Sequence, residues 1–112
     1  MQGLRQQKVA EEIRKAAGEF IAAEANRNAL ITPTRVDISP DLKNAAVYVT
    51  VLPEQHEEEA VNFLRRKRSE FKSYLKKRHF KRLPQTDFKI DYGEKNRQSL
   101  DGINIGEEIS ED

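Results

Sequence analysis

The segment Ala45–Leu52 reads Ala-Ala-Val-Tyr-Val-Thr-Val-Leu, so nearly every position is apolar or favours β-structure. A strand with one solvated face alternates between apolar and polar residues, whereas a strand enclosed on all sides need not. We therefore expect this segment to be the central strand of a sheet. A chain of 112 residues is long enough to enclose such a strand in one core, so a single folded domain is expected.

Two further segments have strand patterns. Leu30–Ile38 carries β-branched residues at every second position and ends at the turn-forming sequence Ser39-Pro40-Asp41. Its Pro33 has no amide hydrogen, which suggests an edge strand. The alternation of Thr86, Phe88, Ile90 and Tyr92 predicts a third strand.

Two helices are expected. The first runs from about Leu4 to Asn26, because apolar residues recur there at spacings of three and four: Val9, Ile13, Ala17, Phe20 and Ile21. The second begins after Pro53, where the acids at 54, 57, 58 and 59 oppose the positive end of the helix dipole. Its apolar stripe is interrupted by Lys67 and Arg68, so we expect a bend near Ser69, with Ser69 capping the distal half.

The predicted order is helix, strand, strand, bent helix, strand. The first two strands form an antiparallel hairpin, and a helical crossover should make the third strand parallel to the second. This order predicts an α+β fold with a three-stranded mixed sheet and helices on one face.

The charges are distributed unevenly along a chain whose net charge is only +1. The segment 65–82 holds ten of the twenty Lys and Arg residues and a single acid, Glu70. From Asp87 onward, eight acids face three bases. Such asymmetry indicates a surface that meets a polyanion, with nucleic acid as the leading partner. The expected RNA-binding residues are Arg65, Arg66, Lys67, Arg68, Lys72, Lys76, Lys77, Arg78, Lys81 and Arg82, together with Arg5 and Lys8.

The sequence gives no indication of an enzyme, a cofactor or a metal site. The chain has no cysteine, and the segment from His56 begins like a zinc-protease helix but has Ala60 where the second ligand should stand. The carboxylates at 57, 58 and 59 are adjacent and therefore diverge around a helix. No apolar run reaches the length of a membrane span or signal peptide, so we expect a soluble cytoplasmic protein with no membrane or small-molecule partner.

Several of these segments resemble bacterial ribosome-binding factor A. The resemblance is carried by Arg5–Ile13, by Val36–Ala45 running into Val47-Tyr48-Val49, by Phe71–Leu75, and by Arg82-Leu83-Pro84 with Phe88–Asp91. It implies a type II KH-like fold and an assembly factor of the small ribosomal subunit, binding precursor rRNA in the neck and decoding region. It further implies release by a GTPase or by the initiation machinery, and we expect the free protein to be a monomer.

The chain departs from the family pattern at the helix bend, where Arg68-Ser69-Glu70 replaces the family's Ala-x-Gly. It also lacks the Gly-x-x-Gly loop with which ordinary KH domains clamp single strands, so binding should depend on phosphates and shape. We expect residues 1–92 to form the KH-like RNA-binding domain and residues 93–112 an acidic, flexible tail.

Two alternatives remain open at this point. The basic segment could belong to a protein-interaction module that binds an acidic protein or an anionic surface, or it could simply be solvated. Among its aromatic residues, Phe71 has the spacing of a core residue, whereas Tyr74 and Phe80 could stack on nucleotides. His79 is either a further RNA-facing donor or a bystander.

Overall fold

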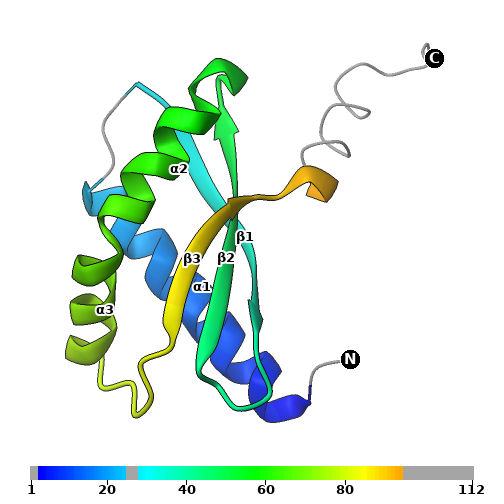
Figure 1. Cartoon of the computed structure of the whole chain (residues 1–112), viewed down its shortest axis with the longest axis vertical. Helices are drawn as coiled ribbons and strands as arrows, with labels where there is room; N and C mark the ends of the chain where they lie inside the picture. The colour runs from blue at the N-terminus through cyan, green and yellow to red at the C-terminus, as the bar shows by residue number, and fades with distance from the viewer. Residues whose placement is uncertain (1–2, 25–27, 95–112) are drawn as a thin grey trace.

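A computed structural model describes residues 3–24 and 28–94 of the chain. Its elements follow the predicted order around one sheet (Figure 1). They are α1 (Leu4–Glu24), β1 (Leu30–Ile38), β2 (Asn44–Leu52), the short 3-10 helix η1 (Glu54–His56), α2 (Glu57–Arg66), α3 (Arg68–Lys77) and β3 (Gln85–Ile90). None of the helices within these described ranges is both long and apolar enough to cross a membrane.

The sheet has the order β1-β2-β3, so the apolar segment around Val47 is central, as predicted. Val47 lies opposite Val36 of antiparallel β1 and opposite Phe88 of parallel β3. The edge position of Pro33 is also confirmed, and the register shifts between Pro33 and Arg35. An edge strand tolerates this irregularity because its outer side needs no hydrogen-bonded neighbour.

The hydrophobic core lies between the helices and one face of the sheet. Alternate residues of β2 are buried there together with the apolar stripe of α1. Phe71 of α3 is fully buried, with its ring centroid 5.2 Å from that of Phe20 in α1 and 5.7 Å from that of Phe88 in β3. Burying one such ring stabilises the fold by roughly 1.5–3 kcal/mol, so these contacts hold α3 against both α1 and the sheet. The α+β, type II KH-like class with helices on one face is confirmed.

The turn between β1 and β2 is closed by its own side chains. The Ser39 hydroxyl donates to Oδ1 of Asp41 at 2.6 Å, and the same oxygen accepts from the Lys43 amide at 3.0 Å. The Asn44 amide donates to Ser39 Oγ at 3.0 Å. The hydrogen bonds to Asp41 lower the pKa of its carboxyl group, and the one from Ser39 has the largest effect. The closed turn holds Leu42 at a φ of 62°. The Leu42 side chain is buried in the core, which explains why an otherwise polar turn contains a leucine.

The second long helix is broken, but the predicted cap is wrong. The break occurs where the apolar stripe is interrupted, and the joint is Lys67, with φ −97° and ψ 10°. Ser69 lies inside the first turn of α3 and makes no capping hydrogen bond. Lys67 carries no apolar side chain for the core, and its ammonium group instead forms ion pairs with Glu24 at 3.6 Å and Glu70 at 3.2 Å.

Three boundaries differ from the sequence-based expectation. The first helix ends at Glu24, and Asn26 lies outside the described residues. A 3-10 turn occupies 54–56 before α2 begins, after a cis peptide bond at Leu52-Pro53. The third strand ends at Ile90, leaving Tyr92 beyond it and exposed. Of the expected tail, only Gly93 and Glu94 are described.

Candidate nucleic-acid interface

Helix α3 presents its cations to solvent because its apolar residues are committed to the core. Phe71 and Leu75 lie four positions apart on one face and are fully buried. Lys72 and Lys76 follow each of them by one position and are exposed. The amphipathic sequence therefore turns the basic side of the helix outward.

Four of the ten predicted cations of the basic segment are paired within the fold. Nε of Arg65 lies 3.0 Å from Oδ1 of Asp87, and Nη1 of Arg68 lies 3.8 Å from the same atom. Lys67 contacts Glu24 and Glu70, and its hydrogen bond to Glu70 is the main cause of its raised pKa. The guanidinium of Arg78 lies 2.6 Å from Oε1 of Glu19. These ion pairs link the helices to one another and to β3.

The other six cations of the segment make no ion pair within residues 3–24 and 28–94, and all of them are exposed. We refer to them as the six unpaired cations. They are Arg66, Lys72, Lys76, Lys77, Lys81 and Arg82. Because they form no ion pair there, they are available to phosphates at no cost of breaking an internal pair.

The end of α3 turns the chain back toward α1. The His79 amide donates to the Lys76 carbonyl at 3.0 Å, and the Phe80 amide donates to the Leu75 carbonyl at 3.3 Å. This is a Schellman motif, in which the residue after the helix adopts the left-handed conformation. Here that residue is His79, with φ 66°. The motif brings residues 78–82 over the N-terminal half of α1.

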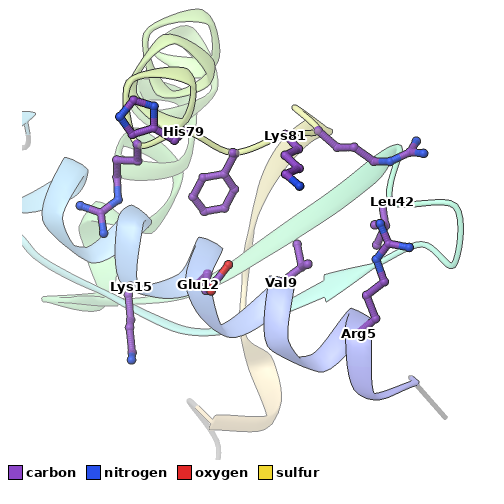
Figure 2. Close-up of a pocket in the computed structure, with 10 residues that line it drawn as sticks. Arg5, Val9, Glu12, Lys15, Leu42, His79 and Lys81 are labelled. Carbon is purple, nitrogen blue, oxygen red and sulfur yellow. The ribbon is translucent and has the colours of Figure 1, made fainter.

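A cavity of about 600 Å³ lies between α1 and residues 78–82 (Figure 2). Of the predicted RNA-binding residues, Arg5, Arg78, Lys81 and Arg82 line it. Lys8 is exposed on α1 but does not line it, and the cations of 65–77 lie elsewhere. The structure thus separates the predicted site into a helical surface and a cavity.

Sequence reasoning missed two charged residues of this cavity, Glu12 and Lys15. Together with Arg5 and Val9 they recur at spacings of three and four, so their common helical face could have been found from the sequence. The sequence could not show that residues 78–82 cover this face, because their position depends on the packing of α3 against α1.

Tyr74 and Phe80, the two aromatic residues that could stack on nucleotides, lie in different surroundings. Tyr74 packs against Phe20, with ring centroids 5.7 Å apart, and its hydroxyl donates to Glu19 at 2.8 Å. This hydrogen bond is the main cause of the raised pKa of Tyr74. Phe80 is half-buried and lines the cavity. Tyr74 is therefore attached to α1 through both its ring and its hydroxyl, whereas Phe80 faces a space that a ligand could enter.

No group of three or more His, Cys, Asp or Glu side chains converges on a metal position in the part of the chain that the structure describes. His56, from the metalloprotease-like segment, has its Nδ1 3.1 Å from Oε1 of Glu59. That neighbouring carboxylate is one turn away on the same helical surface.

The fold and the basic surface define this molecule as a small KH-like domain of the kind found in RNA-associated proteins. The model of the family "Ribosome-binding factor A" matches residues 5–103. The chain belongs to the ribosome-binding factor A family.

Relatives and solved structures agree with this membership. Ribosome-binding factor A from Natranaerobius thermophilus is 29% identical over 96% of this chain and 88% of its own length. That from Macrococcus caseolyticus is 34% identical over 90% of this chain and 96% of its own length. The crystal structure of ribosome-binding factor A from Thermus thermophilus superposes with a TM-score of 0.66 at 28% identity, covering 74% of this chain and 92% of that one. A homology model of the Thermus thermophilus protein, fitted into the cryo-EM map of a 30S complex, gives a TM-score of 0.62 at 30% identity over 70% of this chain and 86% of that one.

Proposed function

We propose that this protein binds the small ribosomal subunit and acts as an assembly factor for it. The family supports this function, and so does the placement of the Thermus thermophilus relative in a complex with 30S. The observation in this chain that carries the proposal is the set of six unpaired cations on α3 and the segments beside it. All six are exposed, four on α2 and α3 and two at the cavity beside α1, and exposed cations of this kind suit a phosphate backbone.

The finer part of the proposal concerns the ligand. The protein contacts precursor rRNA in the neck and decoding region through the six unpaired cations, with Arg5 and Lys8 of α1 extending the surface. The paired cations, such as Arg65 and Arg78, maintain the fold and contribute less to affinity, because an RNA phosphate would have to compete with their carboxylates. The free protein is a cytoplasmic monomer, and its release from the subunit depends on a GTPase or on the initiation machinery.

The test is co-sedimentation with immature small subunits and, separately, with translating ribosomes. Parent protein should sediment with the immature subunits and remain unbound to translating ribosomes. The double variant Lys72→Gln/Lys76→Gln should lose most of its binding. Lys89→Glu serves as the matched control, because it lowers the net charge by the same two units at an exposed position on β3. Equal loss in the variant and the control would show that only net charge matters and would contradict a defined surface.

The division of the chain into residues 1–92 and the tail 93–112 is also a proposal. The tail sequence has five acids and two bases beyond Glu94, so it could screen the basic surface and weaken nonspecific RNA binding. The Glu94 amide donates to Oδ1 of Asp91 at 3.0 Å, so the informative truncation falls after Glu94. This truncation should leave the melting temperature unchanged and strengthen binding to arbitrary RNA; a large drop in the melting temperature would contradict an independent tail.

A further inference from the structure

The cavity between α1 and residues 78–82 has the size of a nucleotide site. Its volume of about 600 Å³ lies within the range of roughly 300–1,000 Å³ that is typical of small-ligand pockets. Figure 2 shows Arg5, Val9, Glu12 and Lys15 along α1 on one side and His79 and Lys81 on the other. One wall is a helix and the other is a turn held by the hydrogen bonds that end α3.

The cavity is strongly positive. Five cations line it, and Glu12 is its only acid among the described residues. Arg78 is held by Glu19, but Arg5, Lys81 and Arg82 make no ion pair within the described part of the chain. These three side chains are therefore available to the phosphates on either side of a bound nucleoside.

The cavity also offers an aromatic ring in a defined position. Phe80 lines it, and the residue is fixed by its backbone hydrogen bond to Leu75 and by partial packing against the core. Val9 and Leu42 add apolar surface at the same cavity. An aromatic ring among cations is the arrangement on which unpaired bases stack in single-stranded RNA sites.

Glu12 favours guanine over the other three RNA bases as the ligand of the cavity. Its carboxylate has no hydrogen-bond or ion-pair partner among the described residues, although cations line the same cavity. A carboxylate can only accept hydrogen bonds, and it accepts two at once from parallel donors. The Watson–Crick edge of guanine provides two such adjacent N–H groups, whereas adenine, cytosine and uracil each offer a single donor group there.

We propose that this cavity binds an unpaired guanosine of RNA, with the base on Phe80, its Watson–Crick edge on Glu12 and its flanking phosphates on Arg5, Lys81 and Arg82. The proposal rests on the proposed function, because it places one nucleotide of the RNA at Lys81 and Arg82, two of the six unpaired cations. It adds base selectivity to a surface that otherwise recognises phosphate and shape.

The test compares three labelled RNA hairpins of equal length: one with a single bulged guanosine, one with a bulged adenosine and one fully paired. The parent protein should bind the guanosine hairpin about tenfold more tightly than the adenosine hairpin. Glu12→Gln should bring these two affinities together, because an amide cannot accept two hydrogen bonds in that geometry. Glu58→Gln, which changes an exposed acid of α2, should keep the tenfold preference.

Phe80→Leu tests the stacking role while keeping apolar packing against the core. It should weaken binding of both bulged hairpins about fivefold or more and leave the paired hairpin unaffected. Circular dichroism and melting measurements establish that the variant is folded. Because the readout is the ratio between bulged and paired RNA, a general loss of stability cannot imitate it.

Two results would overturn the proposal. The first is equal affinity of the parent for bulged and paired hairpins, with no change of ratio in Glu12→Gln or Phe80→Leu. The second is binding of GMP alone as tightly as the guanosine hairpin, which would make the cavity a site for free nucleotides. The proposed function is judged separately, because Lys72→Gln/Lys76→Gln should weaken all three hairpins whether or not the cavity discriminates among bases.

Discussion

The hydroxyl of Tyr74 donates a 2.8 Å hydrogen bond to Oε1 of Glu19, which lies 55 positions earlier in the chain. The same carboxylate oxygen lies 2.6 Å from Nη1 of Arg78. One acid of α1 thus holds both the last turn of α3 and the beginning of the segment that follows it. This contact positions the wall of the cavity that contains Phe80 and Lys81, so the fold and the candidate site depend on it together.

The first prediction concerns the ionisation of Tyr74. Its hydrogen bond to Glu19 raises its pKa above the ordinary value of 10.0, since the carboxylate favours the protonated phenol. Glu19→Gln should lower this pKa, as measured by the ultraviolet absorbance of the phenolate during an alkaline titration. Because the folded-state pKa is raised, the stabilisation is fully present below the unfolded pKa and is lost as pH rises through the folded pKa. Tyr74→Phe should remove this part of the pH dependence, and an unchanged alkaline profile would contradict the assignment.

The second prediction concerns salt. If the six unpaired cations all contact phosphates, the logarithm of the RNA affinity should fall against the logarithm of salt concentration with a slope of about −4 to −5. Lys72→Gln/Lys76→Gln removes two of these contacts and should reduce the magnitude of the slope by about 1.5. A filter-binding titration measures both values. A parent slope near zero would remove the electrostatic explanation of binding.

The order of elements and the sheet topology could be predicted from the sequence because they depend on local periodicity. The strand Leu30–Ile38 has the predicted bounds, and the apolar segment from Ala45 is the central strand. The pairing of charges could not be predicted, since Arg65 meets an acid 22 positions away and Arg78 one that is 59 positions away. The sequence shows ten bases in segment 65–82 but does not show which of them form ion pairs. That difference arises only from the packing of the helices and strands.

The third prediction concerns His79, which ends α3 at a φ of 66°. A side chain in the left-handed conformation costs roughly 1 kcal/mol, and glycine avoids this cost. His79→Gly should therefore raise the free energy of unfolding by about 0.5–1 kcal/mol in a denaturant titration. His79→Ala retains a Cβ and serves as the control, with no stabilisation expected. Destabilisation by glycine would mean that the imidazole contributes more than its backbone strain costs.

The last prediction concerns the joint between α2 and α3, where the sequence suggested Ser69 as a cap. A capping serine is worth about 1 kcal/mol, so replacing it with alanine would destabilise the protein by that amount. In the structure Ser69 is instead the second residue of α3, Lys67 is the capping residue, and no side chain caps the helix. At a position within a helix, alanine is the better helix former by about 0.5 kcal/mol or less. Ser69→Ala should therefore leave the free energy of unfolding unchanged or raise it by up to that amount in a denaturant titration. A loss of about 1 kcal/mol would instead show that Ser69 caps the distal helix and that the helix break lies next to Ser69.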